Sequence, residues 1–364
     1  GPDKVHSVDT FGSVTAGLGI IAHGIERGEI EGQAYTRDDL KRQDVTVNRP
    51  NVSILDSRLL RRRIQVQEEA GGEDAGEGER VLVMLTKENE LLTYRFSGKW
   101  PDLEGMEGEV PPLHAVVVGG VDEPLLLITS RYRFLVVTPR ELMDLEALGQ
   151  PLAELHHFGP YEEVYAVSGW GPLKEAERMV LVTSLGYART YPTDVIVPAI
   201  EAPVPLTFEQ PLPGWPLAAL GAQGDEELIV VTDSGRGARF AVAEIPGTGT
   251  QAFRRKEEEE MAGAVLAVEN DELLLVTDEG YGRRLPPAAV YAPEKGNSRG
   301  RVVISRRPVK GVTRRRPGAA LWAVTTVGLK PLAAEAIPLE RDTTRSHRLI
   351  TLAAEEAVRH ALSV

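Results

Sequence analysis

The sequence contains no cysteine. A disulfide scaffold and a thiolate metal site are therefore excluded, and the absence is typical of a cytosolic protein, so we expect a cytoplasmic chain. No apolar run approaches the roughly 20 residues that a membrane-spanning helix needs, so we expect no membrane association. The chain also lacks the phosphate loop Gly-x-x-x-x-Gly-Lys-Ser/Thr and the catalytic motifs His-Glu-x-x-His and Gly-x-Ser-x-Gly. These absences argue against the enzyme classes that carry such motifs.

Positive charge is in deficit, with 41 Lys and Arg against 54 Asp and Glu and a formal net charge of −13. That balance argues against a nucleic-acid partner, but binding depends on where the charges lie and not only on their sum. Among the basic residues, 32 are Arg and 9 are Lys. Arg suits bidentate phosphate contacts, although a GC-rich genome would produce the same bias. Composition alone therefore does not decide whether nucleic acid binds.

What the sequence does contain is one short pattern, an apolar run that ends in Thr and then turns, repeated six times. The threonines are Thr86, Thr129, Thr183, Thr232, Thr277 and Thr325, at spacings of 43, 54, 49, 45 and 48 residues. A period of this length carried by strands predicts radial repetition of small sheets, as in a propeller. We therefore predict an all-β closed disc of six four-stranded blades over residues 81–364.

A tight turn follows the Thr in each repeat. Gly186, Gly235, Gly280 and Gly328 each lie three residues after the Thr. A hairpin turn needs a residue with positive φ at such a position, and Gly provides it without strain. The second repeat has Tyr132 there, so we expect its turn to differ.

The chain upstream of the blades does not follow the repeat. Apolar residues recur at helical spacing within the first 44 residues, which predicts a small, partly helical N-terminal extension over 1–44. Residues 45–66 contain alternating apolar positions that are typical of strands, and residues 68–79 are acidic and Gly-rich, as in a flexible loop. We expect the segment 45–80 to join or complete the first blade.

The fifth repeat carries the most specific motif. Residues 273–291 read Leu-Leu-Leu-Val-Thr-Asp-Glu-Gly-Tyr-Gly-Arg-Arg-Leu-Pro-Pro-Ala-Ala-Val-Tyr, and residues 295–306 read Lys-Gly-Asn-Ser-Arg-Gly-Arg-Val-Val-Ile-Ser-Arg. These stretches closely resemble the repeat and the basic crossing segment of the C-terminal domains of DNA gyrase and topoisomerase IV A subunits. The resemblance covers roughly residues 81–364. It implies a six-bladed β-pinwheel that bends double-stranded DNA around a positively charged rim, with no catalysis of its own, no cofactor, and type II topoisomerase subunits as further partners.

Two features depart from that family. Its gyrase members carry a Gln-x-Arg-Gly-Gly-Lys-Gly box in the first blade, which chiral wrapping requires, and no such string occurs here. The first repeat ends instead in an acidic stretch at 101–109. The strand-passage domains with the catalytic Tyr are also missing from this sequence. The net charge, the missing box and the acidic first blade favour an alternative in which the pinwheel has lost DNA wrapping and serves as a protein-interaction scaffold.

Candidate DNA contacts form two groups. The first is the stretch 299–316, which has eight positive charges and no acid: Arg299, Arg301, Arg306, Arg307, Lys310, Arg314, Arg315 and Arg316. DNA phosphates could lie along it, because each neutralised phosphate releases a counterion. The simpler interpretation is a solvated loop. With the resemblance we expect DNA contact here, weighted on the last two blades, and we expect Ala at 314–316 to lower affinity for all DNA sequences alike.

The second group follows the turns, at a similar position in each blade: Arg189, Arg239, Arg283, Arg284 and Lys330. Recurrence fits a DNA contact on the rim and a structural ion pair equally well. For metal ions the sequence offers only the neighbours His156 and His157, which on a strand would point to opposite faces and could not chelate one ion. No metal site is therefore expected.

Overall fold

The computed structural model describes residues 79–96, 109–202, 206, 211–294, 296–315 and 320–363. All of them belong to the second of two units into which the chain divides, between residues 63 and 64. The extension predicted over 1–44 and the strand-like stretches predicted at 45–66 lie outside the described residues. Within the described part, no helix is both long and apolar enough to cross a membrane.

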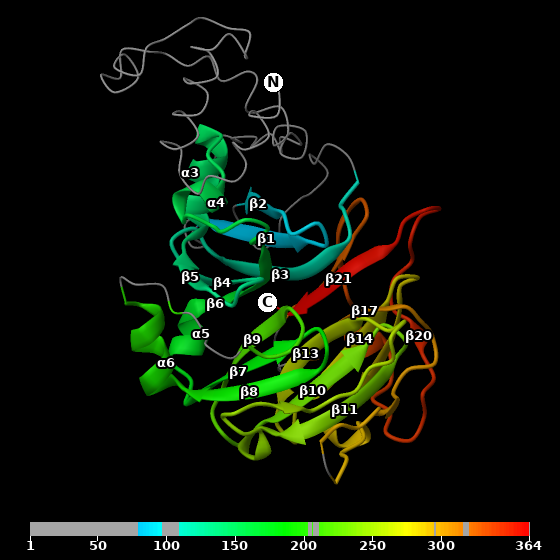
Figure 1. Cartoon of the computed structure of the whole chain (residues 1–364). Helices are drawn as coiled ribbons and strands as arrows, with labels where there is room; N and C mark the ends of the chain where they lie inside the picture. The colour runs from blue at the N-terminus through cyan, green and yellow to red at the C-terminus, as the bar shows by residue number, and fades with distance from the viewer. Residues whose placement is uncertain are drawn as a thin grey trace, which may run out of the picture. The chain divides into compact units, whose positions relative to one another are not determined.

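Six antiparallel sheets, which we number as blades 1 to 6 in chain order, make up the described part (Figure 1). Each has a middle strand flanked by an outer and an inner strand. The middle strands are β1 (Arg80–Thr86), β4 (Leu125–Thr129), β7 (Arg178–Thr183), β10 (Glu227–Thr232), β14 (Glu272–Thr277) and β18 (Leu321–Thr325). The outer strands are β2 (Leu91–Phe96), β5 (Phe134–Val137), β8 (Tyr187–Pro192), β11 (Arg236–Ala241), β15 (Tyr281–Leu285) and β19 (Gly328–Pro331). The inner strands are β3 (Leu113–Gly120), β6 (Val164–Gly169), β9 (Pro216–Ala222), β13 (Met261–Ala267), β17 (Val309–Arg315) and β21 (Val358–Ser363).

The six blades close into a ring. Each inner strand contacts the inner strand of the next blade, and β21 of blade 6 contacts β3 of blade 1. The inner strands surround a central cavity of about 330 Å³. The predicted all-β, six-bladed β-pinwheel is therefore confirmed.

The core lies between the blades. Each of six hydrophobic clusters joins one pair of neighbouring blades, and the pair of blades 6 and 1 is among them. On β14, Leu273 and Leu275 pack toward blade 4 whereas Leu274 and Val276 pack toward blade 6. Because alternate side chains of a strand point to opposite faces, a middle strand that is apolar at every position buries both of its faces. This is why the sequence shows continuous apolar runs rather than alternation.

Blades 3, 4 and 5 obtain a fourth strand from the following repeat. β12 (Thr250–Gln251), β16 (Arg301–Val302) and β20 (His347–Arg348) pair with β8, β11 and β15 respectively. Each lies in a segment that leaves the outer strand of its own repeat, crosses to the preceding blade and returns to its own inner strand. Among the described residues the other three sheets have three strands. The four-stranded prediction therefore holds for three blades.

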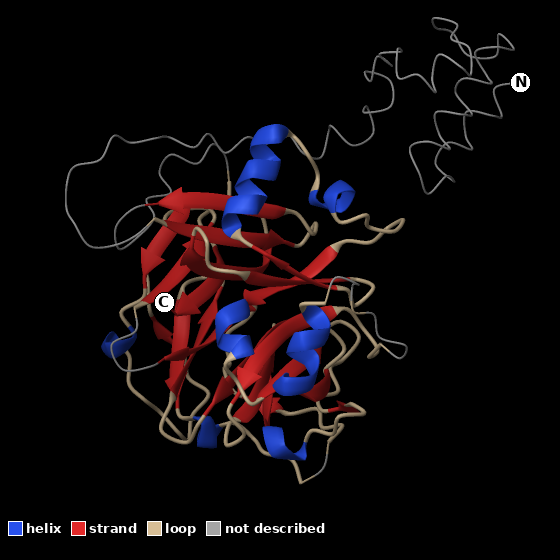
Figure 2. Cartoon of the chain, turned by 90° about the vertical axis from the view of Figure 1, so that its left-hand side faces the viewer, coloured by secondary structure: helices blue, strands red, loops and turns tan. Residues whose placement is uncertain are grey.

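Helices take the place of the crossing strand beside blades 1 and 2 (Figure 2). After β5 the chain forms α3 (Pro139–Leu148) and α4 (Leu152–Leu155), and after β8 it forms α6 (Thr193–Ile200). α3 begins at a capping box of Thr138 and Glu141 and packs against β2, whereas α6 packs against β5. His156 and His157 directly follow α4 and do not lie on a strand. A further helix, α5 (Trp170–Lys174), joins β6 to β7.

The repeated Thr ends every middle strand at the same irregularity. In all six blades the register with the inner strand shifts between the Thr and the residue before it. Such a bulge leaves one additional residue on the inner strand. The Thr side chains are at most 1% exposed. In five blades the hydroxyl accepts the backbone N–H four residues later, at 3.2 Å from Tyr281 to Thr277 for example. The Thr therefore fixes the turn.

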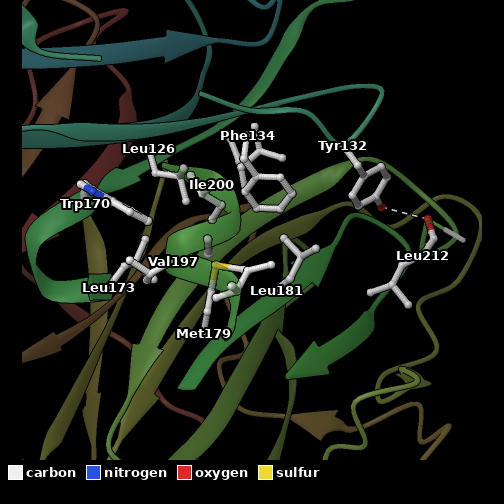
Figure 3. Close-up of a cluster of buried hydrophobic side chains, with 14 residues drawn as sticks. Leu126, Tyr132, Phe134, Trp170, Leu173, Met179, Leu181, Val197, Ile200 and Leu212 are labelled. Carbon is white, nitrogen blue, oxygen red and sulfur yellow. Dashed lines mark hydrogen bonds between the residues drawn. The ribbon is translucent and has the colours of Figure 1, made fainter. Parts of the chain in front are cut away.

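The expectation that the turn of blade 2 differs is wrong. Tyr132 has a left-handed φ of +58°, like the +76° of Gly186, and its N–H bonds the Thr129 carbonyl at 2.8 Å. What differs is the space above the turn. A Cβ on Gly186 would lie 2.1 Å from the carbonyl oxygen of Phe253, because the crossing segment passes there. In blade 2 the Tyr132 side chain packs in the core cluster at this place, and its hydroxyl contacts the Leu212 carbonyl at 2.9 Å (Figure 3).

Candidate nucleic-acid interface

Three crossing segments join along blades 3, 4 and 5 into one surface, which we call the crossing belt. It comprises residues 250–254, 297–307 and 339–350. A parallel bridge between Phe253 and Ser298, and the Arg254 N–H donating to the Ser298 carbonyl at 2.8 Å, connect the first segment to the second. The Ser305 N–H donates to the Thr344 carbonyl at 2.9 Å and connects the second segment to the third. The belt is therefore continuous over three blades.

Exposed guanidinium groups project from all three segments. They are Arg254, Arg299, Arg301, Arg306, Arg307, Arg341, Arg345 and Arg348. The belt contains two carboxylates, Glu340 and Asp342, and the first of these lies 3.3 Å from the His347 ring. Eight arginines against two carboxylates give the belt a local positive excess that is absent from the chain as a whole. Such a local excess is what attracts phosphates.

Tyr281 on the outer strand β15 and Tyr291, which lies between η5 and the second belt segment, orient several of these guanidinium groups. The Arg306 guanidinium lies 3.6 Å from the centre of the Tyr281 ring, and the Arg348 guanidinium lies 5.2 Å from it. Arg348 also donates to the Tyr281 hydroxyl at 3.1 Å. Arg301 covers Tyr291 at 4.1 Å. Because contact with an aromatic face restrains a guanidinium without neutralising it, these arginines remain available to an anion. Arg306 is also paired with Glu279 at 2.8 Å. Because this carboxylate partly neutralises it, Arg306 is the weakest of these arginines as a hydrogen-bond donor to a phosphate.

The arginine that follows the turn serves the blade itself. Arg284 forms a two-pronged pair with Glu272, at 2.7 Å for each contact, and Arg315 donates to the same carboxylate at 2.6 Å. The hydrogen bonds from Arg284, and then those from Arg315, hold the pKa of Glu272 at about 2. In blade 4, Arg239 pairs with Glu227, again twelve residues upstream. The pair thus recurs at one position of the repeat and joins the middle strand to the outer strand.

The side chain at this position of the outer strand, seven residues after the repeated Thr, also holds the crossing segments in place. Thr190, Arg239 and Arg284 donate to the carbonyls of Ile245, Val290 and Ile337 at 2.8, 2.9 and 3.4 Å. Each carbonyl directly follows a short 3-10 helix of the next repeat, namely η4 (Val242–Glu244), η5 (Pro287–Ala289) and η6 (Ala334–Ala336). A side chain on the outer strand of one blade therefore fastens the chain of the following repeat. This contact supports the strand exchange.

Arg283 is a buried support of the belt. It is 2% exposed, and it donates to the carbonyls of Val303, Glu340 (3.2 Å) and Arg341 (3.3 Å). Burial lowers the pKa of this guanidinium. Arg283 thus ties the second belt segment to the third from beneath.

The remaining predicted contacts lie off the belt surface. Arg189 donates to the Thr248 carbonyl at 2.8 Å, Lys330 pairs with Glu356 at 2.6 Å, and Arg314 lies 3.5 Å from Asp271. Lys310 is half-buried on β17, and Arg316 lies outside the described residues. Of the thirteen predicted contacts, the structure brings four to the exposed belt: Arg299, Arg301, Arg306 and Arg307.

Four belt arginines were not predicted as DNA contacts from the sequence: Arg254, Arg341, Arg345 and Arg348. Their common placement is visible only in the structure, where in each of three repeats the crossing segment pairs with the carbonyl of the turn Gly. Phe253, Val303 and Leu349 donate to Gly186, Gly235 and Gly280 at 3.0, 2.8 and 3.0 Å. Aligning the segments on these residues places the arginines of all three on one surface. Among the described residues, no group of three or more His, Cys, Asp or Glu side chains is placed to hold a metal ion.

Comparison with known proteins identifies the fold. No protein-family model matches the sequence, and no curated protein matches it either. Among solved structures, the chain is similar to a DNA gyrase A C-terminal domain, with a TM-score of 0.60 and 16% identity, over 78% of this chain and 99% of that domain. It is also similar to the C-terminal domain of a DNA topoisomerase IV, with a TM-score of 0.53 and 15% identity, over 80% and 94%. The chain therefore has the fold of these domains, as its fifth repeat indicates.

Proposed function

We propose that this domain binds and bends double-stranded DNA, without catalysis of its own, through contacts between the crossing belt and backbone phosphates. One observation carries the proposal: three joined segments present eight exposed arginines against two carboxylates. Phosphate contacts fix the position of a duplex without reading its sequence, so the binding is expected to be insensitive to base order. The fold supports the same proposal, because the similar solved structures are C-terminal domains of DNA gyrase and topoisomerase IV. A type II topoisomerase subunit is the corresponding protein partner.

The net charge of −13 does not oppose this proposal. At about 0.1 M salt the screening length is roughly 10 Å, so a phosphate on the belt interacts mainly with the charges beside it. Those charges are the eight belt arginines, the two belt carboxylates and Glu279 beside Arg306, so positive charge is in excess there. Acidic residues on remote blades lower the rate of encounter more than the stability of the bound state. Low salt should therefore strengthen binding despite the acidic total.

A second candidate function is that of a protein-interaction scaffold. The observation that favours it is the apolar exposure around α3 and α4, where Leu148 is 71%, Leu155 52% and Tyr161 98% exposed. Large exposed apolar side chains that gather in one region are typical of protein contacts. For both candidates we propose the same organisation, with an extension over 1–44, a joining segment over 45–80 and the pinwheel over 81–364.

The two candidates are separated by a titration of a fluorescent duplex at two salt concentrations. Ala at Arg299, Arg301 and Arg307 should weaken binding to every duplex alike, and the salt dependence should flatten by about 0.9 units for each phosphate that the variant no longer neutralises. Arg178→Ala is the matched control, because this arginine is also exposed but lies on β7, off the belt. Equal affinities and salt slopes for the triple variant and the control would reject the DNA interface and leave the scaffold.

A further inference from the structure

The same position of the repeat is filled in two ways. Beside blades 3, 4 and 5 it holds a crossing strand, and beside blades 1 and 2 it holds α3 with α4, and α6. The rim of these five blades thus consists of the crossing belt and of a helical arc, which we define as residues 139–155 and 193–200. Both meet at blade 3, because α6 contacts β8 and β12 pairs with β8.

The sign of the surface charge also changes at blade 3, where the crossing belt meets the helical arc. The three helices of the helical arc contain five carboxylates, Glu141, Asp144, Glu146, Glu154 and Asp194, and one cation, Arg140. That cation forms a two-pronged pair with Asp122, at 2.6 and 2.9 Å. The belt therefore attracts phosphate and the helical arc repels it.

Shape changes at this boundary as well. An added strand extends a sheet by about 4.8 Å, whereas a helix with its side chains is about 10 Å across. A duplex that follows the belt toward blade 2 therefore meets a step at α6, in addition to the reversal of charge. Val195, 65% exposed, lies on this helix.

We infer that DNA bound to this domain follows the rim of blades 3, 4 and 5 and leaves it at α6, so that blades 2 and 1 are excluded from the DNA path. This inference rests on the proposed function. The inference adds how far the contact between DNA and the rim extends. The helical arc acts as a boundary that limits how far the duplex is bent. The rim of blades 1 and 2 is then free to serve the scaffold role while DNA occupies the belt.

The absence of cysteine permits a direct test, because one introduced cysteine is the only thiol. Iron–EDTA attached to that thiol cleaves the DNA that lies beside it. The belt is probed by Ser305→Cys and Thr344→Cys, and the helical arc by Ala147→Cys on α3 and Val195→Cys on α6, all at exposed positions. On a bound duplex we expect strong cleavage from both belt positions and background cleavage from Ala147→Cys, with Val195→Cys cleaving at most the point where the duplex departs.

The outcomes of this experiment test the boundary at the helical arc separately from the proposed DNA binding. Cleavage from Ala147→Cys as strong as from Ser305→Cys would overturn the boundary while leaving DNA binding intact. Failure of the full chain to bind the duplex at low salt would instead reject the proposed function. As a second arm, Asp144→Lys with Glu154→Lys in the Ala147→Cys chain should raise cleavage from α3 above background, and neither residue belongs to the capping box of α3. Unchanged cleavage there would refute the electrostatic part of the boundary.

Discussion

The side chains of Glu272 and Arg284, on the neighbouring strands β14 and β15, are joined by two contacts of 2.7 Å. Arg315, from β17 on the other side of β14, reaches the same carboxylate at 2.6 Å. One acid therefore connects the middle, outer and inner strands of blade 5. Arginines that the sequence offers as DNA contacts are used here to hold a blade together.

We first predict an acid-dependent loss of stability that depends on Glu272. Its pKa is about 2 in the folded chain and about 4.5 without partners, so the pair stabilises the fold above pH 4.5 and loses this contribution as the pH falls toward 2. Glu272→Gln should lower the free energy of unfolding at pH 7 by roughly 2 kcal/mol, because two half-buried guanidinium groups lose their partner. Urea unfolding of both chains at pH 7 and pH 3 measures this. The difference in the free energy of unfolding between the two chains should be smaller at pH 3 than at pH 7. A difference that is independent of pH would contradict the role given to the Glu272 carboxylate.

A second prediction separates stability from DNA affinity. Arg315→Ala should lower the free energy of unfolding by about 1–2 kcal/mol and leave the affinity for DNA nearly unchanged, because this side chain is engaged with Glu272 and Glu335. Arg307→Ala, on the exposed belt, should lower the affinity for DNA and leave the free energy of unfolding nearly unchanged. Thermal unfolding and duplex titration of both variants provide the comparison. A loss of affinity in Arg315→Ala that equals the loss in Arg307→Ala would restore the expectation that the stretch 314–316 contacts DNA.

The third prediction concerns the turns. The single O–H of Tyr132 is shared between the carbonyls of Leu212 and Gly214, at 2.9 and 2.8 Å, so Tyr132→Phe should cost about 1–3 kcal/mol by removing their common donor. Gly235→Ala should cost more. Its Cβ would lie 2.4 Å from the Ile304 carbonyl oxygen, on a backbone with φ of +77°.

Urea unfolding of the two variants tests this order. Gly171→Ala is the control, because a Cβ there has no atom within 4 Å among those of the described residues. If Gly235→Ala unfolded like the control, the close approach of the crossing segment would be refuted.

Much of the fold can be predicted from the sequence because its signals are local. The Thr that ends each middle strand and the Gly three residues later describe one hairpin turn, and both recur in the chain at a regular period. The Tyr132 turn could not be predicted in this way. Whether a side chain fits at a left-handed position depends on what passes above it, and in blade 2 that is the segment 212–214 of the next repeat, whose carbonyls the Tyr132 hydroxyl contacts.

The candidate site was harder to predict for a related reason. Whether an arginine is available to DNA depends on partners distant in sequence, as in the contact of Arg283 with Glu340, 57 residues away. A run of positive charge such as 299–316 shows no such partners. Its first half proves exposed, whereas Arg314 and Arg315 face Asp271 and Glu272. Only the three-dimensional pairing of the strands separates the two halves.

The final prediction is that this chain alone changes DNA topology little. Incubated with closed circular DNA and a relaxing topoisomerase, stoichiometric protein should produce small linking-number shifts or none. A constrained wrap needs a duplex held around most of the disc with its ends brought together, and here the belt spans three blades while the helical arc repels phosphate. The sequence also lacks the Gln-x-Arg-Gly-Gly-Lys-Gly box that wrapping requires in the family it resembles. Asp144→Lys with Glu154→Lys should enlarge the shift if charge sets the limit of the path. Large positive shifts from the unmodified chain would mean that a surface other than the crossing belt completes the wrap.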